Sequence, residues 1–401
     1  MLTLDEALQR LLEPIRPLTG SESVDTFAAL GRVLAAPVVS GLDVPPADNT
    51  SMDGYALRCA DVAAGGTVLP VSQRIPAGQP AQPLSPGTAA RIFTGAQLPD
   101  GADAVVMQEQ CEALADGSVR IDAVPSSGQW IRRRGEDVMR GAEVLRPGDR
   151  LTPQALGLAA SVGAASLQVL RRPRVALFST GDELVMPGEP LRPGAIYNSN
   201  RFTLRALIEQ AGCECSDLGI VPDRLDATRD ALRRAAQGHD LIVTSGGVSV
   251  GEEDHLKPAV EAEGRLDLWQ IAIKPGKPLA FGAVGHEEPT WFIGLPGNPV
   301  SSFITFLLAV RPLLLRLQGV AEWQPRSVPM RADFDWPRAD RRREFLRVRR
   351  NGDDGLDLFG NQSSGVLTSA VWGDGVVDNP PGQTIRRGDV VRYIAFSDWM
   401  S

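Results

Sequence analysis

Apolar residues recur at helical spacing near the start of the chain. Within residues 2–12 they fall on one helix face, at Leu4, Ala7, Leu8, Leu11 and Leu12. Because side chains three and four positions apart share a helix face, this spacing predicts a helix. Similar spacing predicts further helices over residues 22–36 and 154–163.

Residues 43–140 have a different pattern, in which short apolar runs lie between glycines and prolines. The runs at 104–107 and 118–121 are typical of short strands. Because helical spacing returns after this stretch, we expect a β-rich domain at 42–140. It would be inserted into a discontinuous, elongated helical domain made of residues 1–41 and 141–172.

Strand and helix patterns alternate over residues 173–320. The predicted strands are 174–179, 218–221, 241–244 and 291–293, and the predicted helices are 200–211, 227–237 and 300–317. This alternation favours a doubly wound, mostly parallel α/β domain, whose ligands lie at the carboxyl ends of its strands. Short strands and turns over 321–401 predict a C-terminal β barrel. The fold class is therefore multidomain, α/β and β.

Composition narrows the function classes. The 401 residues are 43% hydrophobic and 22% charged, as in ordinary soluble proteins, and the net charge of −8 argues against a nucleic-acid surface. We find no signal-peptide pattern, and the apolar run 303–310 is too short to span a membrane. The four cysteines lack metal or redox spacing. We expect a cytoplasmic protein with reduced cysteines and neither nucleic-acid nor membrane partners.

Two loops of the α/β segment follow predicted strands and carry carboxylates. One, at 179–184, includes Glu183, and the other runs from Ser245 through Gly246, Gly247 and Ser249 to Asp254. Glycines allow backbone N–H groups to approach a phosphate closely. Mg²⁺ prefers carboxylate oxygens together with substrate phosphates. We therefore predict that Glu183 and Asp254 hold Mg²⁺.

Two further loops offer cations and hydroxyls. Lys274 and Lys277 lie three residues apart between prolines and can present two charges to one oxyanion. Asn298 and Ser301 begin a long apolar helix, whose N-terminus attracts anions. Taken alone, each loop is better explained as an ordinary turn or helix cap. Together the four loops favour a phosphate or oxyanion substrate. The basic runs 132–134 and 341–343 are either anion contacts or solvated loop charges.

The four loops and the motifs at 49–56, 92–96, 101–106 and 134–137 resemble the molybdopterin molybdenumtransferase family. This is the bacterial family similar to the E domain of gephyrin, and the motifs span most of the chain in order. The resemblance implies molybdate and adenylylated molybdopterin as substrates, Mg²⁺ as cofactor and AMP as leaving group. It also implies an elongated homodimer, whose cleft combines the α/β domain and barrel of one subunit with the inserted domain of the other.

The resemblance also implies the site residues. The expected catalytic residues are Asp53, Thr94, Asp137, Glu183 and Asp254, and the last two are also the expected metal ligands. The expected substrate-binding residues are Asp223, Ser245, Gly246, Gly247, Ser249, Lys274, Lys277, Asn298, Ser301 and Ser363. Arg347 is the expected basic companion of Ser363. His255 stands where relatives usually carry tyrosine, and Thr50 and Ser51 also depart from the family pattern.

Three alternatives remain open at this stage. The first is the related molybdopterin adenylyltransferase, which is typically a single small domain with a Thr-Gly-Gly-Thr-Gly loop. The second is a scaffold without catalysis, since gephyrin's E domain also serves at receptors. The third is a form specialised for tungstate, which has the same charge as molybdate and nearly the same size. The implied partners are the adenylyltransferase and the maturation factors of molybdoenzymes.

Overall fold

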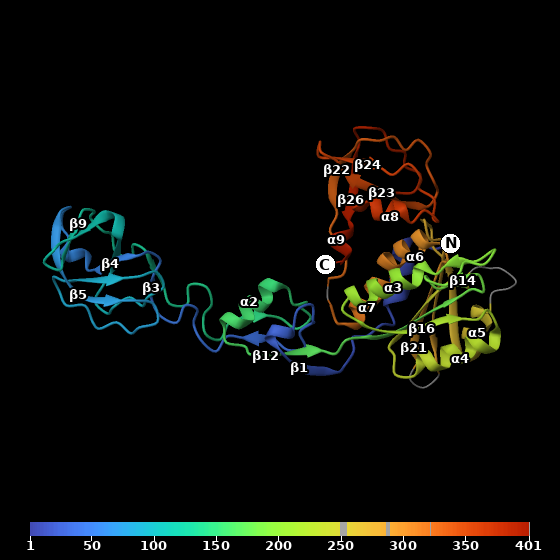
Figure 1. The fold of residues 1–401 in the computed structure, drawn as a ribbon, viewed down its shortest axis with the longest axis horizontal. Coiled ribbons are helices and arrows are strands. Elements are labelled where there is room, and N and C mark those ends of the chain that lie inside the picture. Colours follow the sequence, from blue (N-terminus) through green and yellow to red (C-terminus); the bar gives the residue numbers. More distant parts are fainter. Residues whose placement is uncertain (249–254, 286–288, 321, 401) are drawn as a thin grey trace.

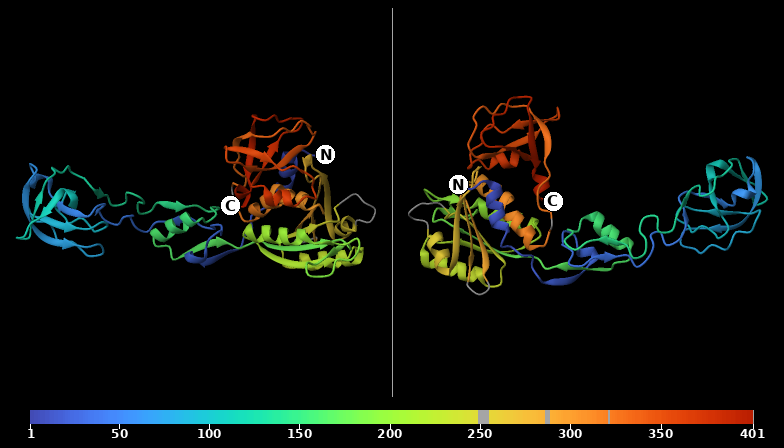
Figure 2. Two further views of the ribbon diagram at one scale, coloured as in Figure 1. Left: turned by 45° about the horizontal axis from the view of Figure 1, so that its top comes forward. Right: turned by 180° about the vertical axis from the view of Figure 1, so that it is seen from behind.

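The computed structural model describes residues 1–401 except 249–254, 286–288, 321 and 401. The chain is elongated (Figure 1). A β-rich body lies at one end, a small unit around α2 lies in the middle, and the α/β body with the C-terminal barrel lies at the other end. The two views in Figure 2 show the same separation.

The α/β body is built on a six-stranded sheet. Its strands, in spatial order, are β16 (Glu214–Val221), β13 (Arg174–Thr180), β17 (Leu241–Ser245), β21 (Thr290–Leu295), β20 (Pro278–Val284) and β18 (Gly264–Gln270). The first three pairings are parallel and the last two antiparallel. The predicted mostly parallel sheet is therefore confirmed. Ser179 pairs with Ser245, and Ser245 with Leu295, so these strands end at one edge.

Helices cover both faces of this sheet, because side chains alternate along each strand. Val175 and Leu177 pack into one core, and Ala176 and Phe178 pack into the other. The helices that pack into the first core are α1 (Leu4–Leu12), α3 (Ser199–Gln210), α6 (Pro299–Thr305) and α7 (Arg311–Leu317). The helices that pack into the second core are α4 (Leu225–Ala236) and α5 (Leu256–Glu263). The domain is thus doubly wound.

The long helix 299–317 consists of α6, a π-helical segment at Phe306–Val310 and α7. Among the described residues it alone is long and apolar enough to span a membrane, with a mean hydropathy of 1.7. However, 89% of its most apolar stretch is buried inside the protein. It therefore has the burial of a core helix.

The middle unit differs from the expected helical domain. Residues 22–36 were predicted to be helical, but Ser21–Asp25 form β1, which pairs with β12 (Ser166–Leu170), and only a short 3₁₀ turn follows. Pairing with a distant strand overrides the local spacing here. β2 (Val38–Val39) pairs with β11 (Glu143–Leu145), and α2 (Pro153–Ser161) is the unit's helix. Helix α1 packs in the α/β core instead of this unit.

The inserted body contains a second six-stranded sheet. Its strands, in spatial order, are β7 (Ala104–Met107), β4 (Gly54–Leu57), β6 (Ala89–Ile92), β5 (Thr67–Ile75), β9 (Ser118–Ile121) and β8 (Cys111–Ala113). β7 and β9 coincide with the strands predicted from the sequence. Beside the sheet, β3 (Asn49–Thr50) pairs with β10 (Ile131–Arg132).

The C-terminal region is a closed barrel, as predicted. Its strands run in the order β23 (Arg343–Arg350), β24 (Gly355–Leu358), β22 (Val328–Ala332), β26 (Val390–Ala395) and β25 (Gly375–Asn379), and β25 pairs back onto β23. Two short helices, α8 (Thr368–Trp372) and α9 (Phe396–Met400), belong to the same region. A strand from the α/β body, β19 (Ile273–Lys274), also pairs with β23. The loop with both lysines therefore begins at the junction with the barrel.

Candidate functional site

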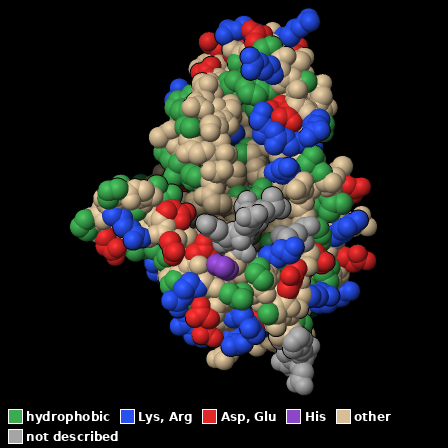
Figure 3. Space-filling model, turned by 90° about the vertical axis from the view of Figure 1, so that its right-hand side faces the viewer, with side chains coloured by type: hydrophobic (Ala, Val, Ile, Leu, Met, Phe, Trp, Pro, Cys, Tyr) green, Lys and Arg blue, Asp and Glu red, His purple; other side chains and the backbone are tan. Residues whose placement is uncertain are grey.

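A cleft of about 680 Å³ opens where β13, β17 and β21 end, between the α/β body and the barrel. Nine of the predicted residues line it: Glu183, Asp223, Gly246, Gly247, Lys274, Lys277, Asn298, Ser301 and Ser363. On the face of the molecule that Figure 3 shows, basic and acidic side chains are interspersed. The four loops identified in the sequence therefore meet at one edge of the sheet, with a barrel loop beside them.

The glycine loop packs against the first strand end. Gly246 has a φ of +91°, and a Cβ atom there would lie 2.7 Å from the Thr180 carbonyl oxygen. Its N–H donates to the Leu295 carbonyl oxygen at 3.1 Å, which corrects the expectation that this amide cradles a phosphate. Gly247, with a φ of +66°, lines the cleft. Ser249 and Asp254 lie outside the described residues.

Ser245 lines a second lobe, of about 560 Å³, beside the main cleft. Its side chain is buried, and its hydroxyl oxygen accepts a hydrogen bond from Asn200 Nδ2 at 2.7 Å. The two lobes share Thr180, Glu183, Gly246, Gly297 and Asn298. Asn198, which the sequence did not indicate, also lines this lobe. Its buried Nδ2 has no hydrogen-bond partner in the part of the chain that the structure describes. A buried amide left unpaired is a group that a ligand could satisfy.

The two cleft lysines are not equivalent. Lys274 Nζ lies 3.0 Å from Glu344 Oε1 and 3.4 Å from Asp340 Oδ2. Lys277 forms no ion pair with any residue that the structure describes. Gly276, which separates them, has a φ of +109°, and a Cβ there would lie 2.4 Å from Thr305 Oγ1. The loop is therefore held tightly against α6.

The N-terminus of α6 lies in the cleft. Asn298 is its N-cap residue, but its side chain makes no capping hydrogen bond, and Ser301 follows in the first turn. The Val300 N–H donates to the Ser364 carbonyl oxygen at 3.0 Å. This bond joins the barrel loop that carries Ser363 to the start of the helix.

Arg347 and Arg342 differ in their roles from the sequence-based expectation. Arg347 is 1% exposed, does not line the cleft, and donates from Nη2 to the Ser363 carbonyl oxygen at 3.4 Å. Burial lowers its pKa to about 10. Arg342 lines the cleft instead and binds Asp340 through two hydrogen bonds from its guanidinium group, of 3.0 and 2.8 Å. Arg342 belongs to the basic run 341–343, for which the sequence left open a contact with an anion.

The carboxylates of the cleft fit a magnesium ion shared with substrate. Among the described residues, no group of three histidines, cysteines or acids is close enough to hold a metal alone. Glu183 and Asp223 line the cleft, together with Thr180, whose buried hydroxyl has no hydrogen-bond partner among the described residues. Mg²⁺ commonly takes one or two carboxylates and completes its shell with water and substrate phosphates. The donor set suits that arrangement.

The three predicted residues near the inserted body are far from this cleft within one chain (Figures 1 and 2). Asp53 Oδ1 accepts hydrogen bonds from the backbone N and the Oγ1 of Thr94, both at 2.7 Å. These bonds lower the pKa of Asp53, the backbone bond most strongly. Asp137 is exposed, and its N–H donates to the Val44 carbonyl oxygen.

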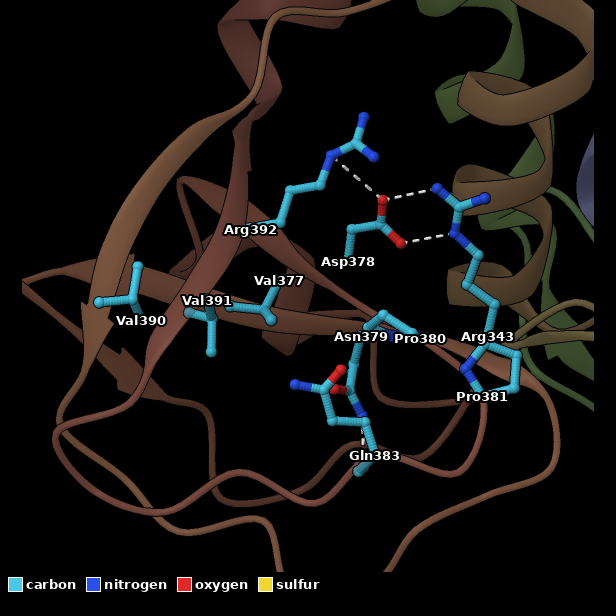
Figure 4. A pocket seen from close by; sticks show the side chains of 10 residues that line it. All are labelled: Arg343, Val377, Asp378, Asn379, Pro380, Pro381, Gln383, Val390, Val391 and Arg392. Carbon is cyan, nitrogen blue, oxygen red and sulfur yellow. Dashed lines mark hydrogen bonds and ion pairs between the residues drawn. The ribbon is translucent and has the colours of Figure 1, made fainter.

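A separate cavity of about 430 Å³ lies on the barrel (Figure 4). Its charges compensate one another, because Asp378 lies between Arg343, with hydrogen bonds of 2.6 Å, and Arg392, at 3.5 Å. None of the predicted site residues lines it. The chemistry predicted from the sequence therefore belongs to the cleft.

Family models match the chain along most of its length. The MoeA N-terminal region (domain I and II) matches residues 2–163, a probable molybdopterin binding domain matches residues 176–316, and the MoeA C-terminal region (domain IV) matches residues 329–396. The first model spans helix α1, the middle unit and the inserted body, the second spans most of the α/β body, and the third spans the barrel.

Individual proteins are similar over nearly the whole chain. Molybdopterin molybdenumtransferase of Haemophilus influenzae is 42% identical over 92% of both chains, and the Nostoc protein of the same name is 38% identical over 91% of this chain and 86% of its own. A crystal structure of the molybdopterin biosynthesis MoeA protein from Pyrococcus horikoshii has a TM-score of 0.85 and 29% identity, covering 99% of this chain and 100% of its own. The chain belongs to the molybdopterin molybdenumtransferase family.

Proposed function

We propose that this enzyme transfers molybdenum from molybdate to adenylylated molybdopterin, with release of AMP, and that it does so in the cleft between the α/β body and the barrel. This is the last step of molybdenum cofactor biosynthesis. One observation carries the assignment of the site. Lys277, Ser301 and Ser363 come from three separate segments and line one cleft with the carboxylates of Glu183 and Asp223.

The residues divide the work by their chemistry. Lys277 attracts the molybdate oxyanion by charge, and the hydroxyls of Ser301 and Ser363 donate hydrogen bonds to it at the N-terminus of α6. The backbone at Gly247 approaches the phosphates. We assign Glu183, with Asp223 or Asp254, to hold Mg²⁺. When bound, the ion neutralises charge on the phosphate of the departing AMP.

The alternative functions are less well supported. Molybdopterin adenylyltransferase was expected to be a single small domain, whereas the relatives named molybdenumtransferases align over the inserted body and the barrel as well. A scaffold without catalysis would not need Lys277 and Glu183 in one cleft. Tungstate remains an alternative substrate, to be distinguished by assaying it beside molybdate.

We expect Glu183→Gln to lower molybdate-dependent AMP release by about 100-fold, because a bound metal ion supplies several kcal/mol of charge stabilisation in the transition state. AMP released from adenylylated molybdopterin would be measured with molybdate and Mg²⁺. Glu189→Gln is the matched control, since Glu189 is exposed and does not line the cleft. Equal rates in both variants would remove Glu183 from the site. No release by the folded wild-type enzyme would overturn the function.

The enzyme is proposed to act as a homodimer. Asp53 and Thr94 lie at the far end of the chain from the cleft, so they can reach a cleft only in a second copy. Exposed apolar side chains on the middle unit offer surface for such contact, with Phe27 98% exposed and Leu30 56% exposed.

Mixing two inactive variants tests this arrangement. We expect Asp53→Ala and Lys277→Ala each to lack activity alone. Random mixed dimers would then recover about a quarter of wild-type activity, because half of the dimers are mixed and each of these has one intact site. AMP release would be measured after subunit exchange, and the oligomeric state by sedimentation. A shared site would be excluded if sedimentation showed both variants to be monomers. It would also be excluded if AMP release did not recover although subunit exchange had been demonstrated.

The proposed reaction also places the protein among its partners. Its substrate must come from an enzyme that adenylylates molybdopterin, and its product must pass to the factors that load molybdoenzymes. Both are proposed to meet it in the cytoplasm.

A further inference from the structure

A charged network joins the barrel to the loop that carries the two lysines. β19 of the α/β body runs parallel to β23 of the barrel, and this pairing places Lys274 opposite Glu344. Lys274 Nζ contacts Glu344 Oε1 at 3.0 Å. The position of Lys274 is thus set by backbone pairing and by an ion pair at the same point.

Glu344 is held in turn by groups of the barrel. It is 1% exposed, and its Oε2 accepts hydrogen bonds from Trp336 Nε1 at 2.8 Å and from Asn379 Nδ2 at 3.4 Å. Lys274 Nζ also lies 5.8 Å from the centre of the Trp336 ring. A buried carboxylate with donors on both oxygens has little freedom to move, so it can fix a flexible lysine.

A second carboxylate completes the network. Asp340 contacts Lys274 at 3.4 Å and receives three hydrogen bonds from Arg342, one from its backbone N–H and two from its guanidinium group. The Arg342 guanidinium holds the pKa of Asp340 well below its usual range, so this carboxyl stays charged. Lys274 and Arg342 are therefore each compensated by a carboxylate, whereas Lys277 is not compensated by any residue that the structure describes.

We propose that Glu344 is a positioning residue for molybdenum transfer. It fixes the ammonium group of Lys274 at the rim of the cleft, and Lys277 provides the uncompensated charge that attracts the oxyanion. Lys274 remains 38% exposed and lines the cleft, so it can contact a bound substrate while Glu344 holds it. Holding the cation in advance avoids ordering a long side chain during the reaction. This inference rests on the proposed function.

Glu344→Asp is the most direct test, because it keeps the charge but withdraws the carboxylate from Lys274. We expect the kcat of AMP release to fall by about 100-fold, the cost of misplacing a group by about 1 Å. Molybdate binding, measured by titration calorimetry, should change less than about threefold, because Lys277 is untouched. Asp378→Glu is the control. It alters a barrel carboxylate that is also buried and also paired with a basic side chain, in this case arginine, but that lies outside the cleft.

A second measurement does not depend on activity. Limited acetylation, read by mass spectrometry, reports how readily each lysine reacts. Glu344→Gln should raise the acetylation rate of Lys274 relative to Lys257 severalfold, because loss of the ion pair releases the Lys274 side chain from the barrel. Unchanged Lys274 reactivity would overturn the proposal even if the enzyme proved to have another function. Equal losses of kcat in Glu344→Asp and Asp378→Glu would also overturn it, since they would indicate only a weakened barrel.

Discussion

Lys277→Ala should lower molybdate-dependent AMP release by about 100-fold or more, the usual cost of removing a group that stabilises developing charge in a closed site. Lys277 lines the cleft beside Ser301, and none of the described residues forms an ion pair with it. Its full charge is therefore available to the oxyanion. The variant should bind molybdate more weakly, as measured by titration calorimetry, and release AMP more slowly, as measured by the AMP assay.

Two lysines serve as comparisons for this result. Lys257 is exposed on α5 and does not line the cleft, so Lys257→Ala should keep wild-type rates. Lys274→Ala should also reduce activity, but with a measurable loss of stability, because it leaves Glu344 buried without its cation. If Lys277→Ala bound molybdate as tightly as wild type, the oxyanion site would have to be placed elsewhere.

Gly54→Ala should destabilise the inserted body by about 3 kcal/mol or more, at the upper end of the range for overpacked cores. Gly54 lies in β4, between β6 and β7, and a Cβ atom there would lie 1.9 Å from the Val106 carbonyl oxygen. Backbone on the neighbouring strand has no room to yield. Because Asp53 precedes this residue, its bonds to Thr94 should be disturbed as well. Thermal and urea unfolding would measure the effect.

Gly157→Ala provides the matched control for this prediction. Gly157 lies in helix α2 with open space where a Cβ would stand. The same substitution there should stabilise the protein by up to about 1 kcal/mol, because alanine is the better helix former. Similar unfolding curves for the two variants would show that the close contact at Gly54 relaxes without cost.

Many elements could be predicted because their signals are local. The buried strands β13, β17 and β21 read as short apolar runs, and α3 and α4 as amphipathic helices. Loops that follow parallel strands meet at one sheet edge whatever the details of packing. The convergence of Glu183 and Gly247 on one cleft followed from that rule. Lys277 does not follow it, because its loop precedes the antiparallel strand β20.

The errors arose where distant segments meet. Residues 22–25 belong to the stretch 22–36 with helical spacing but pair with 166–169 as a strand, and helix α1 packs with α7 in the α/β core. The partner in each case lies more than a hundred residues away. Local spacing carries no information about such a partner, so propensity was overridden by tertiary contact.

By itself, the amino-acid sequence determined the α/β alternation, the inserted β body, the barrel and the residues that carry charge into the site. Only the tertiary structure decided which of these charges are compensated. Lys274 and Lys277 look alike in the sequence, yet the pairing of β19 with β23 places Glu344 against Lys274 alone. The tertiary structure also decided that Arg342 lines the cleft and that Arg347 is buried behind Ser363. Charge compensation depends on distances of a few ångströms between separate domains, and these distances exist only once the chain has folded.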